Sequence, residues 1–102
     1  MTVLKTETVM LEVLRERVTQ FVGYGDKNAG LSLHEYLGIL IEDVGEAAKS
    51  INDSNRKAIG WLKELGNLDR ARAELIQTAA TAVGMVEAID NRIAAFRKKT
   101  KP

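Results

Sequence analysis

The apolar positions of this chain follow a helical period along nearly its whole length. Over residues 3–22 they recur at intervals of three, four and seven, which predicts one amphipathic helix. The next stretch, 23–30, is the long glycine-rich segment of the chain, and we expect a loop there. The apolar stripe of the first helix consists of Leu4, Leu11, Leu14, Val18 and Phe21.

The second helical segment begins at a capping box. Glu35 follows Ser32 by three residues, a pattern in which the serine caps the helix and the glutamate reaches back to the serine backbone. The apolar period continues to Ser50 or Ile51, where we expect the helix to end. Its expected core stripe consists of Leu33, Leu37, Leu40, Val44, Ala47 and Ile51.

The third part of the chain divides at turn-forming residues. A break at 52–55 precedes an expected short helix over 56–65, which carries Trp61 and ends with Gly66 in the C′ position. A long helix is then predicted from Leu68 to about Lys98. Its apolar stripe consists of Leu68, Leu75, Ala79, Ala82, Val86, Ile89 and Ile93.

These elements predict an all-α protein, a helical bundle of three main helices plus a short one. We expect a single domain over residues 1–102, with a basic tail from about residue 97. Two of the main helices are apolar nearly all round, which is typical of helices buried in a large core or in an oligomer. A chain of 102 residues has little core of its own. We therefore expect a homodimer or homotetramer that completes the bundle.

Composition and charge exclude several classes of function. Fifteen Lys and Arg against fourteen Asp and Glu give a net charge of +1, which argues against a nucleic-acid partner. The absence of cysteine excludes disulfides and thiolate zinc sites, and one histidine, His34, leaves little for a catalytic triad. No apolar run approaches the ~20 residues of a membrane span. The charged start of the chain does not fit a signal peptide, so we expect a cytoplasmic protein without a membrane partner.

The second helix carries three acids close together, Glu42, Asp43 and Glu46. Asp43 and Glu46 are three residues apart and therefore share a helix face. That sector is mostly apolar, and acids there are unfavourable without a partner. The alternative is a solvated helix face on which Glu46 pairs with Lys49.

The long helix offers a matching pair, Glu74 and Gln77. If the two helices pack antiparallel, the two pairs can face each other and bring together four oxygen ligands. Three like charges at one place repel unless a cation joins them or some take up protons. Hard oxygen ligands suit Mg²⁺ or Mn²⁺, which can bridge a polyphosphate. A salt bridge between Glu74 and Arg70 is the plain alternative.

The two acidic motifs and the residues around them resemble the MazG-like all-α nucleoside triphosphate pyrophosphohydrolases. That family carries Glu-Glu-x-x-Glu, a variable spacer and then Glu-x-x-Asp. Here Glu42-Asp43-x-x-Glu46 precedes Glu74-x-x-Gln77 by 27 residues, and the likeness covers residues 32 to 90. The resemblance implies Mg²⁺-dependent cleavage of a nucleoside triphosphate into the monophosphate and pyrophosphate.

Carried over position by position, the resemblance gives each acid a role. Asp43, Glu46 and Glu74 match metal ligands, and Gln77 stands where the family has an aspartate. Glu42 matches the first acid, which orders the attacking water or holds a second metal. Asp43 is one methylene shorter than the family's glutamate, and Gln77 keeps an oxygen but lacks the charge. The second departure weakens Mg²⁺ binding.

Three residues are candidates for substrate binding. Lys49 and Arg70 carry the positive charge that a triphosphate needs, although each also fits an ordinary surface position. Trp61 either stacks on a nucleobase or closes a helix joint. Two other functions remain open: a catalytically weakened relative that binds nucleotide or metal, and a structural helical oligomer whose acids are surface charges.

Overall fold

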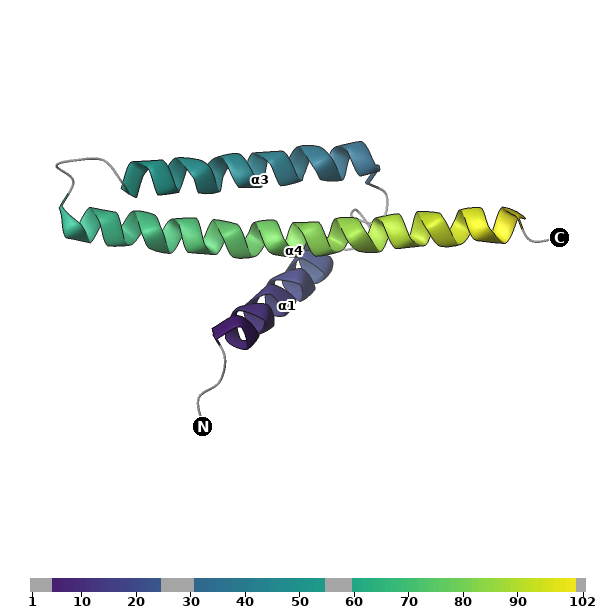
Figure 1. The fold of residues 1–102 in the computed structure, drawn as a ribbon, viewed down its shortest axis with the longest axis horizontal. Coiled ribbons are helices and arrows are strands. Elements are labelled where there is room, and N and C mark those ends of the chain that lie inside the picture. The colour runs from purple at the N-terminus through teal and green to yellow at the C-terminus, as the bar shows by residue number, and fades with distance from the viewer. Residues whose placement is uncertain (1–4, 25–30, 55–59, 101–102) are drawn as a thin grey trace.

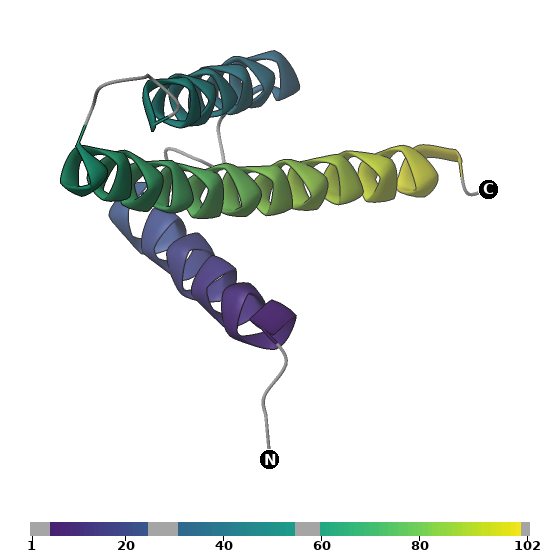
Figure 2. The ribbon, with the colours of Figure 1, turned by 60° about the vertical axis from the view of Figure 1, so that its left-hand side comes forward.

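The computed structural model describes residues 5–24, 31–54 and 60–100, and within these ranges the chain forms three helices and no strand. They are α1 (Lys5–Tyr24), α3 (Leu33–Ser54) and α4 (Trp61–Thr100). Helices α3 and α4 lie antiparallel and side by side, and α1 crosses α4 at a steep angle (Figure 1, Figure 2). The predicted all-α class is confirmed. None of the described helices has a stretch long and apolar enough to cross a membrane.

The start of α3 is the predicted capping box. The backbone N–H of Glu35 donates to Ser32 Oγ at 3.1 Å, and the backbone N–H of Ser32 donates to Glu35 Oε1 at 3.2 Å. The N–H of Tyr36 donates to the carbonyl oxygen of Ser32 at 3.0 Å, which closes the first helical turn. The cap therefore fixes where α3 begins, as the sequence predicts.

The predicted short helix and its stop at Gly66 are wrong. Gly66 lies inside α4, which begins after Gly60, where the Gly60 carbonyl accepts the N–H groups of Lys63 and Glu64. A single glycine costs a long helix only about 1 kcal/mol relative to alanine, too little to end it. Residues 56–59 of the expected short helix lie outside the described ranges, as do residues 25–30 of the expected loop and the end of the basic tail.

Helix α3 also runs past its predicted end, through Asn52 and Asp53 to Ser54. The reason lies in its packing, because Ser50 and Ser54 are both buried. They continue the spacing of Tyr36 and Ala47, the other buried residues of α3. Tertiary burial therefore outweighs the turn preference of the asparagine and the aspartate.

The α3 face that meets α4 is rotated by about 60° from the predicted core stripe. It carries small and polar side chains, and the opposing face of α4 includes Ala71 and Thr81, both buried. Of the predicted stripe, Ala47 is buried and Leu33 and Leu40 are half-buried. The remaining stripe residues, Leu37, Val44 and Ile51, are exposed, so the predicted core stripe is not the face of α3 that packs against α4.

Helix α1 packs on α4 through its mixed face around the buried Val13. Arg17 pairs with Glu87 at 2.9 Å, and Arg72 pairs with Glu12. The hydrogen bond from the Arg72 guanidinium holds the pKa of Glu12 below its ordinary value. The predicted apolar stripe of α1 faces away from α4. Its described members, Leu11, Leu14, Val18 and Phe21, are all exposed.

The stripe predicted for the long helix is also left open. Leu68, Leu75, Val86, Ile89 and Ile93 are exposed, and only Ala79 and Ala82 are partly covered. Arg97, Lys98 and Lys99 of the predicted basic tail belong to the last turn of α4, where cations complement the helix dipole. No large side chain of the described residues is fully buried.

We predict that Gly66→Ala stabilises the protein by about 1 kcal/mol, because alanine is the better helix former. A Cβ added at Gly66 meets no atom within 4 Å, so no clash offsets the gain. The measurement is the free energy of unfolding in urea.

Gly38→Ala is the matched control, because Gly38 lies in the middle of α3 and a Cβ there also meets open space. The two variants should gain similar stability. A destabilised Gly66→Ala beside a stabilised Gly38→Ala would mean that a left-handed turn ends a helix at Gly66.

Candidate functional site

Two of the predicted metal ligands lie in the interface between α3 and α4. Asp43 is half-buried on α3, and its Oδ2 accepts a hydrogen bond from Thr81 Oγ of α4 at 3.1 Å. Glu74 is half-buried on α4, and both of its carboxylate oxygens lie 3.2 Å from Ser50 Oγ of α3. Each helix therefore presents one acid and one hydroxyl to the other, in a reciprocal arrangement.

Thr81 joins all three helices. It is 6% exposed, and its hydroxyl accepts a hydrogen bond from Gln20 Nε2 of α1 at 3.3 Å while donating to Asp43. The same Gln20 nitrogen lies 3.3 Å from the backbone oxygen of Gln77. A chain of hydrogen bonds thus runs from α1 through α4 to the acid on α3.

The two interface acids stand one heptad apart. Asp43 pairs with Thr81 and Ser50 with Glu74, so both helices advance seven residues between the pairs, or about 10.5 Å along the axis. Thr78 lies between them on α4 and donates to the backbone oxygen of Glu74 at 2.7 Å. In the described part of the chain, no three His, Asp or Glu side chains are grouped so as to hold a metal ion.

The other predicted acids lie at the edge of this interface. Glu42 and Glu46 are exposed on α3, and Gln77 is exposed on α4. At 100° per residue, Glu46 is turned about 80° from the direction in which α3 faces α4, and Gln77 about 70° from the direction in which α4 faces α3. Both turns lead to the same side of the helix pair, which is the side that α1 occupies. The structure therefore sets Glu46 and Gln77 along one margin of the helix pair, with Asp43 and Glu74 in the interface one heptad apart.

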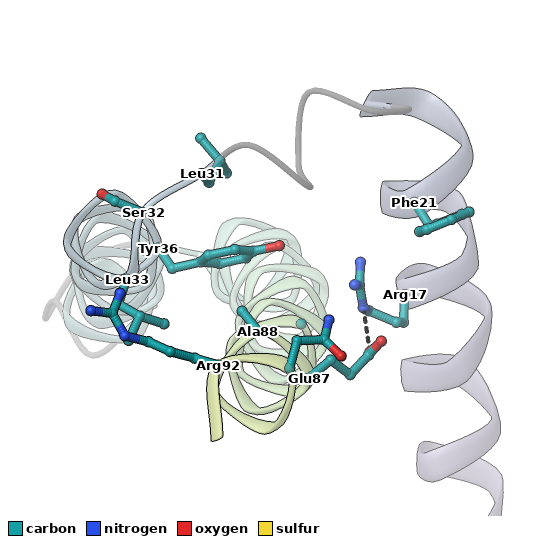
Figure 3. A pocket seen from close by; sticks show the side chains of 11 residues that line it. Arg17, Phe21, Leu31, Ser32, Leu33, Tyr36, Glu87, Ala88 and Arg92 are labelled. Atoms are coloured by element: carbon teal, nitrogen blue, oxygen red, sulfur yellow. Dashed lines mark hydrogen bonds and ion pairs between the residues drawn. The ribbon is translucent and has the colours of Figure 1, made fainter. Parts of the chain in front are cut away.

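A cavity of about 320 Å³ opens on this same side, between α1, the start of α3 and α4. Figure 3 shows Tyr36 of α3 and Arg17 of α1 pointing into it, with Arg17 paired to Glu87. The Arg17 side chain is only 13% exposed, and a Cβ at Gly84 would lie 3.1 Å from its guanidinium carbon, so the glycine makes room for it. The remaining lining residues are Phe21, Leu31, Ser32, Leu33, Ala88, Asn91 and Arg92.

The predicted substrate-binding residues are not gathered at the acids. Trp61 is 72% exposed at the start of α4, thirteen residues before Glu74, which is about 20 Å along a helix. Lys49 is exposed on α3. Arg70 is exposed one turn before Glu74 and makes no ion pair with it among the described residues.

Sequence reasoning missed the residues that hold the acids in place. Thr81, Ser50 and Gln20 are ordinary polar residues in helices, and nothing in their local sequence marks them. The available signal was spacing: Ser50 follows Asp43 by seven residues, and Thr81 follows Glu74 by seven, so each hydroxyl shares a helix face with an acid.

The chain was compared with protein-family models, with curated proteins and with solved structures, and nothing matched in any of the three comparisons.

We predict that Thr81→Val destabilises the fold by about 1–3 kcal/mol, because Asp43 loses its donor in a partly buried place and Gln20 loses one of its two acceptors. Valine keeps the shape of the side chain, so the change reports the hydroxyl. The measurement is the free energy of unfolding in urea.

Thr81→Ser is the control, because serine keeps the hydroxyl and loses only a methyl group. In a double-mutant cycle, Asp43→Ala should cost the same stability in the Thr81→Ser background as in the wild type. It should cost less in the Thr81→Val background, where the hydrogen bond is already lost. Equal stability of wild type and Thr81→Val would show that the hydrogen-bond chain does not hold the helices.

Proposed function

We propose that this protein is a Mg²⁺-dependent nucleoside triphosphate pyrophosphohydrolase of the MazG-like all-α type. It would work as a cytoplasmic homo-oligomer and release a nucleoside monophosphate and pyrophosphate. The observation that carries the proposal is the placement of Asp43 and Glu74 on facing surfaces of two antiparallel helices. The acidic motifs that resemble the family are 27 residues apart in sequence, and packing brings their helices together.

The donor set fits Mg²⁺ or Mn²⁺ in kind. Asp43, Glu46 and Glu74 supply hard carboxylate oxygens, and the side chain of Gln77 supplies a neutral one. Such an ion, when bound, neutralises the negative charge that develops on the triphosphate. Thr81 and Ser50 hold Asp43 and Glu74 about 10.5 Å apart along the helix axes, so the two carboxylates would have to leave these hydroxyls and approach each other to share one ion.

The remaining groups would act on the substrate. Glu42, exposed one residue before Asp43, would order the water that attacks phosphorus. The cavity beside Gly84 supplies an aromatic ring from Tyr36 and guanidinium groups from Arg17 and Arg92. A nucleotide needs both a flat apolar contact and positive charge, which supports this side of the helix pair as the substrate side.

We predict that the protein releases monophosphate and pyrophosphate from at least one nucleoside triphosphate in the presence of Mg²⁺. Glu46→Gln should lower the rate by about 100-fold or more, because a ligand charge that stabilises the transition state is lost. The measurement is product identification by ion-exchange chromatography across a panel of ribo- and deoxyribonucleotides.

Glu7→Gln is the matched control, because it makes the same change on an exposed site in the first turn of α1 and should leave the rate unaltered. Absence of turnover across the panel, with the chain folded, would contradict the proposal. Equal loss in both variants would do so as well.

A catalytically weakened binding protein is the second candidate. It is favoured by Gln77, which brings no charge to the site, and by the hydroxyls that already satisfy Asp43 and Glu74. A structural oligomer is the third, and in that case Asp43 and Glu74 serve only as hydrogen-bond acceptors between helices.

We predict that Mg²⁺ raises the melting temperature of the protein, because an ion that binds only the folded state stabilises it by mass action. Gln77→Asp should increase that rise, since the variant adds the missing charge. The measurement is thermal unfolding by circular dichroism over a Mg²⁺ titration, with K⁺ at matched ionic strength as control. An unchanged melting temperature in both proteins would support the structural role.

A further inference from the structure

A continuous apolar face of α3 and α4 takes no part in the packing of the single chain. Leu75 and Val86 of α4 are 49% and 56% exposed, although they belong to the most apolar stripe of that helix. On α3 the exposed members of the apolar stripe are Leu37, Val44 and Ile51. We call these two exposed stripes together the open apolar face.

The two stripes lie on one side of the helix pair. At 100° per residue, the stripe of α4 is turned about 90° from its contact with α3, and the exposed stripe of α3 about 80° from its contact with α4. Because the helices are antiparallel, these rotations bring both stripes to the same side. Ala80 and Gly84, which α1 covers, lie about 140° and 180° from the α4 stripe, so α1 occupies the opposite side.

The open apolar face carries no charge along its centre. Between Leu68 and Ile93, every residue of α4 within about 40° of the stripe is Leu, Ile, Val or Ala. The corresponding sector of α3, from Leu33 to Ile51, is also entirely apolar. An exposed apolar surface of this extent on a folded chain marks an interaction site.

The extent of this face is close to what a stable dimer requires. From Leu68 to Ile93 the α4 stripe extends over 25 helical steps, or about 38 Å, and from Leu37 to Ile51 the α3 stripe extends over 14 steps, or about 21 Å. With each helix about 10 Å wide, the two stripes cover about 600 Å², against about 800 Å² per partner in a standard interface. The radius of gyration is 17.4 Å, whereas a compact chain of this length has about 13 Å.

Six of the seven residues of the α4 stripe pair symmetrically about its midpoint, and this near-symmetry identifies the occupant. The seventh, Ile89, corresponds to Arg72, which lies about 60° from the centre of the stripe. Two alanines, Ala79 and Ala82, stand at the centre, with Leu75 four residues before and Val86 four residues after them. Seven residues further out on each side come the outer pair, Leu68 and Ile93. A surface of this kind is complementary to itself under a two-fold rotation.

We propose that a second copy of this chain docks on the open apolar face, with α4 antiparallel to α4 of the partner subunit. The two-fold axis passes between Ala79 and Ala82, where the small side chains let the helices approach closely. Leu75 then packs against Val86 of the partner subunit, and Leu68 against Ile93 of the partner subunit. The α3 stripes close the sides, so the dimer has a four-helix core. This proposal does not rest on the proposed hydrolase activity.

The same rotation gives the interface complementary ends. It sets Glu64, one turn before Leu68, opposite Arg97 of the partner subunit, one turn after Ile93. Opposite charges therefore meet at the rim, where they favour the antiparallel register over a parallel one.

Cysteine pairs test this register directly, because the chain has no cysteine of its own. In the double variant Leu75→Cys/Val86→Cys, the two thiols of one chain stand 11 residues, or about 16 Å, apart along the helix and cannot be bridged within it. A short bismaleimide should convert this variant into a covalent dimer on a denaturing gel. Each single variant is a matched control and should remain uncrosslinked, because its two copies are also about 16 Å apart across the two-fold axis.

The mass of the wild-type protein in solution is the second measurement. Light scattering should give twice the 11.2 kDa of the chain, or a multiple of that dimer with the same cross-linking pattern. Val86→Asp should weaken association by at least 100-fold, while Val18→Asp, on the exposed stripe of α1, should leave it intact. Circular dichroism checks that both variants keep their helices.

Three results would overturn the proposal. The first is a monomeric wild type at 100 µM, and the second is cross-linking of a single variant as efficient as that of the double variant, which a parallel arrangement gives. The third is equal dissociation of Val18→Asp and Val86→Asp. None of these depends on nucleotide turnover, so this proposal and the hydrolase proposal fail separately.

Discussion

The hydroxyl of Thr81 is the contact on which the arrangement of the three helices depends. It lies nearly out of solvent, accepts from Gln20 and donates to Asp43, so one oxygen connects α1, α4 and α3. A half-buried carboxylate without a donor is unfavourable, and this hydrogen bond gives Asp43 a reason to remain at the interface. The reciprocal bond between Ser50 and Glu74 does the same one heptad away. Together the two bonds set the register of α3 on α4.

That register has a consequence on the other side of the helices. Turning Asp43, Ala47 and Ser50 toward α4 turns Leu37, Val44 and Ile51 away from it, because one helix cannot direct both sets at the same neighbour. The close contact of α3 and α4 is made of small and polar residues, and most of the large apolar side chains lie outside it. The polar interface and the open apolar face are thus two results of one rotation of α3.

Local signals in the sequence predicted local structure well. The capping box at Ser32 and Glu35 depends only on neighbours in sequence, and the structure shows it as predicted. The helical periods of all three main helices were likewise apparent from the spacing of apolar residues. The prediction at Gly66 was wrong because glycine occurs both just after the end of a helix and inside helices. The neighbouring residues in the sequence do not distinguish these two positions. The length of α3 was underestimated because Ser54 is buried by packing that no local pattern reports.

The orientation of the helices could not be predicted from apolar stripes, because a stripe identifies a buried face without naming what buries it. The stripes that carry Leu14 on α1 and Leu75 on α4 were recognised as apolar, but neither faces another helix of the single chain. The spacing of the acids, and the resemblance of their motifs to a family, led us to expect that Asp43 and Glu74 meet. The structure places each against a hydroxyl of the opposite helix, one heptad apart. It missed Thr81, whose importance comes from joining three helices that are distant in sequence.

The two proposals concern opposite sides of α4 and are compatible in space. The cavity, Gln77 and the margin that carries Glu46 lie on the side of α1, whereas the open apolar face lies on the side away from it. A second chain docked on the apolar face would therefore leave the acids open to substrate. Dimerisation would also fix the helix that carries Glu74, because α4 would then be held on three sides, by α1, by α3 and by its symmetry mate. In its proposed role as a metal ligand, Glu74 would gain from such a rigid support, because less motion would have to be lost when the ion binds.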